Sequence, residues 1–130
     1  MTDTFYSKLA KVRHYIHERP EISEQEFETT KYIKNYLSEL GIEPLNYPLE
    51  TGVIAEIGSG LPIIALRADI DALPIVEKTN LDYASSNGAM HACGHDFHQT
   101  SLLGAAELLK EREDELNGTV RLIFQPAEEN

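Results

Sequence analysis

Two short apolar segments constrain the fold of this 130-residue chain more than any other feature. Residues 62–68 are almost continuously apolar, which is typical of a strand covered on both faces. Residues 119–124 have the same character, because Ile123 makes the second face of that strand apolar as well. Strands of this kind need further layers of structure around them. The sequence therefore predicts a layered α/β domain with a central sheet.

Helical spacing of apolar residues predicts helices at 5–18, at 24–40 and from about residue 96. Ser23 and Glu26 form a candidate capping box at the start of the second helix. The predicted inward faces are Phe5, Leu9, Val12 and Ile16 in the first helix, Phe27, Thr30, Ile33, Leu37 and Leu40 in the second, and Leu102, Ala105, Ala106 and Leu109 in the third.

The remaining segments are strands, turns and one long loop. Residues 53–57 alternate between apolar and other side chains, as in a strand with one wetter face. Residues 58–60 and 117–118 are predicted turns. Residues 69–90 show little periodicity and are predicted to form an irregular loop, a length of loop that is usually functional or disordered.

The overall charge argues against two classes of partner. The chain has 22 acidic and 11 basic residues, a formal net charge of −11, so it should repel nucleic acids and anionic membranes. It has no apolar run of the roughly 20 residues that a membrane span needs. A single cysteine rules out an intramolecular disulfide, and no secretory signal is visible, so a cytoplasmic location is expected.

The segment His91-Ala92-Cys93-Gly94-His95-Asp96-Phe97-His98 concentrates thiol, imidazole and carboxylate groups just before a predicted helix. These are donors for a borderline divalent metal, and a helix N-terminus should favour a thiolate. Gly94 should let Cys93 and His95 converge. The alternatives are ordinary histidines beside one buried thiol, or a structural zinc site, which a single cysteine disfavours.

Two further acidic groups follow predicted strands. Glu128 and Glu129 come directly after the last strand, where ligands gather in α/β sheets. One such carboxylate can bind a metal while its neighbour takes a proton, although a solvated acidic pair is the plainer alternative. Asp69 and Asp71 follow residues 62–68, and either orient metal ligands or brace the loop.

Four segments together resemble the N-terminal part of aminoacylase-type metallopeptidases, and most closely the N-acyl-amino-acid amidohydrolase branch. That branch includes hippurate hydrolases, N-acetyldiaminopimelate deacetylases and plant hydrolases of auxin–amino acid conjugates. The segments are His17-Glu18-Arg19-Pro20-Glu21 and residues 66–74, 90–98 and 124–129. The resemblance covers nearly the whole chain, and its last two segments are highly specific.

The resemblance implies hydrolysis of an N-acyl amino acid to a carboxylic acid and a free amino acid, with a metal-bound water as nucleophile. Cys93, His95 and Glu129 would bind a pair of divalent ions, Mn²⁺ or Zn²⁺ with Co²⁺ as a further candidate, and Glu128 would be the general base. Residues expected to orient these ligands from outside are Asp69, Asp71, Asp96 and His98.

The resemblance also implies a layered α/β/α catalytic domain with a central mixed sheet, of which residues 1–130 would be an incomplete N-terminal portion. The lid or dimerisation domain, the rest of the catalytic domain and further histidine ligands would lie outside it, in a homodimeric full-length protein. Two departures stand out: Arg19 where many relatives carry histidine, and Asp69 where more distant peptidases carry a histidine ligand.

The motifs leave three hypotheses open. The chain is part of a metal-dependent amidohydrolase that is inactive alone, or a non-enzymatic fragment that binds a metal or a partner. The third makes Cys93 a nucleophile that is paired with His91, His95 or His98.

Overall fold

The computed structural model describes residues 2–130, and it contains the predicted elements in the predicted order. The helices are α1 (Asp3–Glu18), α2 (Phe27–Glu39) and α3 (His95–Glu111), with a short 3₁₀ turn at Glu113–Glu115. The strands are β1 (Val53–Gly58), β2 (Ile63–Asp69) and β3 (Thr119–Gln125). Residues 70–94 form the expected irregular loop, which is tied together by a bridge between Leu73 and Met90.

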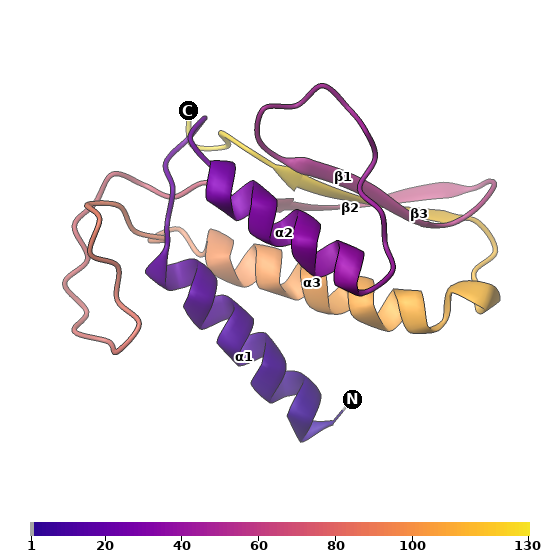
Figure 1. Cartoon of the computed structure of the whole chain (residues 1–130), viewed down its shortest axis with the longest axis horizontal. Helices are drawn as coiled ribbons and strands as arrows, with labels where there is room; N and C mark the ends of the chain where they lie inside the picture. The colour runs from indigo at the N-terminus through magenta and orange to yellow at the C-terminus, as the bar shows by residue number, and fades with distance from the viewer. Residues whose placement is uncertain (1) are drawn as a thin grey trace.

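The three strands form one open mixed sheet in the order β1-β3-β2. β3 lies in the centre, antiparallel to β1 and parallel to β2. A parallel pair needs a long crossover, which the loop and α3 supply. Helices α2 and α3 pack against the sheet, and α1 packs against α3 (Figure 1). The prediction of a layered α/β domain with a central mixed sheet is therefore confirmed, as a partial α/β domain.

Apolar side chains from the helices, from β1 and β3, from the carboxyl end of β2 and from two connecting segments form the core. Thr30, Ile33 and Leu37 of α2 face inward, as the helical spacing predicts, but the prediction is wrong for Phe27, which lies exposed in the first turn. β1 buries every second residue, because alternate side chains of a strand point to the same face. The core residues are Val12, Ile16, Ile33, Leu37, Ile42, Val53, Ala55, Ile57, Ala68, Ile70, Leu102, Leu103, Ala106, Leu122 and Phe124. No helix within residues 2–130 has the length and apolarity needed to cross a membrane.

The prediction that residues 62–68 are covered on both faces is wrong for the chain as it stands. β2 lies at the edge of the sheet, where Ile63 and Ile64 are 45% and 60% exposed. Within residues 2–130, β3 is the one strand that pairs with it. Only Ala68 and Asp69 at its carboxyl end are buried. An apolar sequence predicts a strand, but burial depends on neighbours that the pattern does not specify.

The predicted capping box is also wrong. α2 begins at Phe27, which is 54% exposed, and the side chain of Glu26 makes no hydrogen bond to the helix start. Glu21 performs the capping instead, because its carboxylate accepts the Thr29 backbone N–H at 2.6 Å. Ser23 and Glu26 are engaged elsewhere, at the end of the sheet described next.

Candidate metal centre

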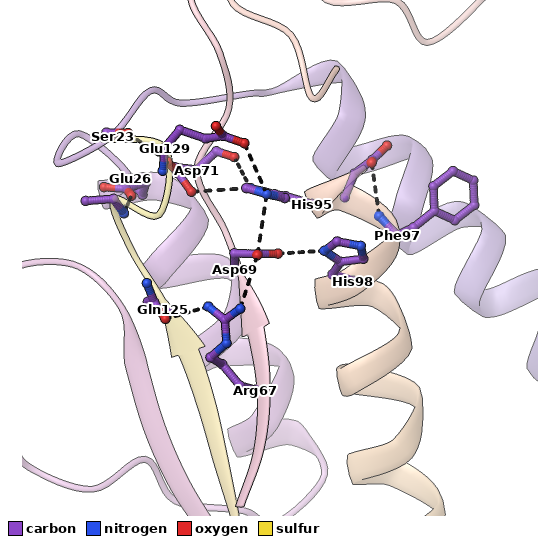
Figure 2. A network of polar contacts seen from close by, with 12 residues as sticks. Ser23, Glu26, Arg67, Asp69, Asp71, His95, Phe97, His98, Gln125 and Glu129 are labelled. Atoms are coloured by element: carbon purple, nitrogen blue, oxygen red, sulfur yellow. Dashed lines mark hydrogen bonds and ion pairs between the residues drawn. The ribbon is translucent and has the colours of Figure 1, made fainter. Parts of the chain in front are cut away.

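Three segments meet at the end of the sheet where the parallel strands terminate. They are the carboxyl end of β2, the carboxyl end of β3 and the start of α3 (Figure 2). The parallel register pairs Asp69 with Gln125, so both strands end at the same level. The Ile70 N–H continues the ladder by donating to the Gln125 carbonyl at 3.0 Å. The residues that follow each strand are thereby held close together.

Cys93, His95 and Glu129 each present a ligand atom, and these three atoms lie within 4.8 Å of one another. Gly94 makes this convergence possible, because its φ of +92° is a left-handed conformation that L residues rarely adopt. His95 is buried, whereas Cys93 and Glu129 are exposed. The structure therefore brings together the three predicted ligands from two distant parts of the chain.

The ring of His95 has a defined orientation. Its Nδ1 lies 2.7 Å from the backbone carbonyl of Asp71, and because a carbonyl only accepts, Nδ1 must carry the hydrogen and donate. In the neutral ring, the form that binds a metal, Nε2 then carries the lone pair. It faces Glu129 Oε1 at 3.5 Å and Asp69 Oδ2 at 3.4 Å. In metal-binding histidines the ring nitrogen that does not bind the metal usually donates such a hydrogen bond, which fixes the tautomer.

A second group of possible ligands shares His95 and adds Asp69 and His98. His98 lies one turn along α3, and its Nδ1 is 2.6 Å from Asp69 Oδ1. Burial raises the pKa of Asp69, but the hydrogen bond from His98 and the charge of His95 outweigh it, so the net pKa is lowered. Asp69 is therefore an anion that lies beside the ring of His95, as expected of a residue that orients a ligand.

Asp71 holds the turn that carries Glu128 and Glu129. Its Oδ2 accepts the Glu129 backbone N–H at 2.9 Å and the Ser23 hydroxyl at 2.7 Å. Burial raises the pKa of Asp71, and these hydrogen bonds outweigh that effect, so the net pKa is lowered. Glu128 itself is exposed on this turn, next to Glu129. The structure thus gives Asp71 two contacts with the candidate centre, one through its carbonyl and one through its carboxylate.

The expectation that the helix N-terminus favours a Cys93 thiolate is contradicted by the carboxylates around the thiol. A hydrogen bond to the carboxylate of Glu129, followed by the charges of Glu129 and other nearby acidic groups, raises the pKa of the Cys93 thiol. A full negative charge on a neighbouring carboxylate exceeds the partial positive charge of a helix N-terminus, which is about half a unit. A divalent cation would reverse this balance, because coordination deprotonates a thiol.

Asp96 does not belong to this group, contrary to the prediction. Its Oδ2 lies 2.8 Å from Arg13 Nε and 2.7 Å from His17 Nδ1, on the side of α3 that faces α1. Consecutive residues at a helix start point in different directions, about 100° apart. His95 and Asp96 therefore enter two separate networks.

Two side chains near the centre, Ser23 and Glu26, were not predicted to belong to it. Glu26 accepts the Ala127 backbone N–H at 2.6 Å, and Ser23 donates to Asp71. Their sequence pattern had suggested a helix cap, so no local signal pointed to this role. His91 is buried, and both ring nitrogens lack a hydrogen-bond partner within residues 2–130. Burial lowers its pKa to about 4.

Comparison with known proteins identifies the family. The model of the family described as "Peptidase family M20/M25/M40" matches residues 65–130, which include all of the candidate ligands. This chain belongs to that family. The suspected relationship to aminoacylase-type metallopeptidases is thereby confirmed.

Individual relatives match almost the whole chain. An N-acetyl-L-cysteine deacetylase of Bacillus subtilis is 58% identical over 129 residues, which are 97% of this chain and 31% of the relative. The IAA-amino acid hydrolase ILR1-like 5 of Arabidopsis thaliana is 50% identical over 98% of this chain and 30% of its own length. The chain thus spans about a third of the length of the curated relatives it matches.

A solved structure has the same fold. A crystal structure from Bacillus subtilis, described as a dinuclear metal-binding peptidase of the M20 family, superimposes with a TM-score of 0.94 at 57% identity. The match covers 98% of this chain and 37% of that one. Two metals are therefore a property of a near relative.

Proposed function

We propose that this chain supplies part of a two-metal active site that hydrolyses the amide bond of an N-acyl amino acid. The observation that carries the proposal is the convergence of Cys93, His95 and Glu129 at the end of the sheet, with Glu128 on the same turn. Family membership and the activities named for the two curated relatives support the reaction class. The products would be a carboxylic acid and a free amino acid.

The residues present fit a divalent transition metal. A thiol, an imidazole with a free Nε2 and a carboxylate suit Zn²⁺, Mn²⁺ or Co²⁺. When bound, divalent ions polarise a carbonyl and lower the pKa of water. Cys93, His95 and Glu129 would hold the ions, and Asp71 would fix the ring of His95.

Glu128 is the proposed general base. It would accept a proton from the attacking water and return it to the leaving amine. Its exposed position leaves the carboxylate accessible, and the hydrogen bond of the next residue to Asp71 fixes the turn beneath it.

The one cysteine is unpaired, which supports a reducing compartment such as the cytoplasm.

Metal binding by the 130-residue chain is the first test. Titration with Co²⁺ should produce the charge-transfer absorption of a cobalt–thiolate bond. Cys93→Ser should abolish that absorption, and His95→Ala should weaken binding by more than about 100-fold, since outer residues alone are worth 10- to 100-fold. His14→Ala, which removes a histidine whose ring stacks on Tyr83 outside the candidate centre, is the matched control. Unchanged binding in Cys93→Ser and His95→Ala would refute the metal centre.

Hydrolysis is the second test, in a protein that continues this chain to the length of its relatives. We expect release of free amino acid from N-acetyl or N-benzoyl substrates, lost on chelation and restored by Mn²⁺ or Zn²⁺. Glu128→Gln should lower kcat by about 100-fold or more, the contribution of a general base, while Co²⁺ binding is retained. The 130-residue chain alone should hydrolyse little. Equal activity of Glu128→Gln would exclude Glu128 as the base.

Two alternatives predict different results. A Cys93 nucleophile would give activity that survives chelation and is lost on alkylation. The raised pKa of its thiol disfavours this mechanism. A non-enzymatic binding role would give metal binding without hydrolysis at any length of chain.

A further inference from the structure

A buried carboxylate from outside the predicted motifs reaches the turn that carries Glu128 and Glu129. Glu26 stands just before α2 and is fully buried. Its Oε2 accepts the backbone N–H of Ala127 at 2.6 Å, across 101 positions of sequence. Figure 2 shows Glu26 just below Ser23, to the left of Asp71 and His95.

The turn that carries Glu128 and Glu129 requires stabilisation by residues outside it. Ala127 has a φ of +54°, a left-handed conformation that residues other than glycine rarely adopt. It is followed at once by Glu128 and Glu129, whose side chains carry the proposed chemistry. Two buried carboxylates hold the turn from beneath, Glu26 at the Ala127 N–H and Asp71 at the Glu129 N–H. With both hydrogen bonds in place, the backbone that carries the two glutamates is fixed at Ala127 and Glu129.

Few hydrogen bonds within the fold offset the free-energy cost of burying the Glu26 carboxylate. Its second oxygen, Oε1, is buried without a hydrogen-bond partner within residues 2–130. A buried carboxylate with a single hydrogen bond is costly, so a residue selected only for packing would be apolar. The one hydrogen bond that residues 2–130 give its side chain is to the turn of the candidate centre.

We propose that Glu26 is a positioning residue, which aims Glu128 and Glu129 by holding the Ala127 N–H. The inference rests on the proposed function, because the value of aiming these carboxylates lies in the metal centre. Ser23 acts with it indirectly, because its hydroxyl fixes the carboxylate of Asp71 that holds the other end of the turn.

Two variants of Glu26 separate positioning from packing in the 130-residue chain. Glu26→Gln keeps an oxygen that can accept the Ala127 N–H, whereas Glu26→Leu fills a similar volume without an acceptor. We expect Glu26→Leu to raise the Co²⁺ dissociation constant by about tenfold or more, as outer residues of metal sites do. Glu26→Gln should stay close to the wild type. Glu28→Leu, the same change at an exposed site on α2, is the matched control.

Amide hydrogen exchange gives a readout that needs no metal. In Glu26→Leu the Ala127 amide should exchange faster, while amides in the middle of β3 keep their protection. Cobalt–thiolate absorption should persist, because Cys93 and His95 do not depend on Glu26. Equal Co²⁺ affinity and equal Ala127 exchange in Glu26→Leu would overturn the inference. An equal loss of affinity in both variants, with lowered protection throughout the sheet, would overturn it in favour of a purely structural role.

The two proposals fail in different ways. If the wild-type chain shows no cobalt–thiolate absorption, the metal centre is refuted, and the exchange rate of Ala127 still decides whether Glu26 holds the turn. If the wild type binds Co²⁺ through Cys93 and Glu26→Leu does so equally well, the metal centre stands and the positioning role is refuted.

Discussion

Two networks of histidines and carboxylates meet at the start of α3, and they differ in how their charges are satisfied. His95 enters one and its neighbour Asp96 enters the other. In the second, both ring nitrogens of His17 face carboxylates, Asp96 at 2.7 Å and Glu77 at 3.0 Å, and Arg13 supplies a cation. In the first, Nε2 of His95 faces two carboxylates only at 3.4 and 3.5 Å.

This difference distinguishes a structural network from a candidate metal centre. The network around His17 is closed, since the described residues supply both its anions and its cation. In the group around His95, by contrast, Arg67 is half-exposed and lies 3.8 Å from Asp69 Oδ2, a longer contact than the 2.8 Å between Arg13 and Asp96. Residue composition is similar in the two, so composition alone would not separate them. The first network should contribute mainly to stability and the second mainly to metal binding.

The largest effect on stability is expected from Asp96→Ala. This change leaves Arg13 and His17 without their shared partner in a buried setting, so the free energy of unfolding should fall by about 3–5 kcal/mol. Urea denaturation measures it. Asp114→Ala, at an exposed position, should change stability by no more than about 0.5 kcal/mol. A loss below about 1 kcal/mol in Asp96→Ala would mean that the network is not a stabilising one.

A smaller effect is expected from acid. Burial raises the pKa of Glu77, but hydrogen bonds from the Ser85 N–H, Thr79 and His17 lower it to about 2 from an ordinary 4.5. A pKa lowered by folding stabilises the folded state above the unfolded pKa. That contribution is lost as pH falls from about 4.5 toward 2.

Glu77→Gln tests this directly, because glutamine does not titrate. In unfolding experiments between pH 6 and 3, the variant should be less stable near neutrality and should lose less stability on acidification, by about 1–2 kcal/mol. The matched control is Glu24→Gln, at an exposed glutamate outside this network. Parallel pH profiles for wild type and Glu77→Gln would show that the loop is not held by an ionised Glu77.

The smallest effect on stability is expected from Cys93→Ser, which removes a candidate ligand from the group around His95. Cys93 is exposed, so its removal should change the free energy of unfolding by no more than about 0.5 kcal/mol. Thermal or urea unfolding in the absence of metal measures it. A loss of more than about 1 kcal/mol would mean that the candidate ligands also hold the fold together.

Local pattern was sufficient for the elements and for part of the site. Helical spacing predicted α1, α2 and α3, and alternation predicted β1, because these periods follow from backbone geometry. The cluster from His91 to His98 and the pair Glu128–Glu129 were recognisable from residue type and from their position after strands. The structure then brought Cys93, His95 and Glu129 together, as predicted.

The errors all concern partners that are distant in sequence. The spacing of Ser23 and Glu26 matches a capping box, yet both serve the far end of the chain, because the folded loop brings Asp71 and Ala127 within reach of them. Asp96 was grouped with its neighbours in sequence, but helix geometry turns it toward His17. Apolar residues predicted β2, but its place at the sheet edge left most of it exposed.

The sequence by itself determined which segments are helices and strands, and which residues have the chemistry to bind a metal, because periodicity and side-chain type are local properties. Only the tertiary structure decided which nitrogen of His95 stays free, which carboxylates hold the turn of Glu128 and Glu129, and which histidine network is closed. These depend on distances between residues far apart in the chain, and such distances exist only once the sheet has formed.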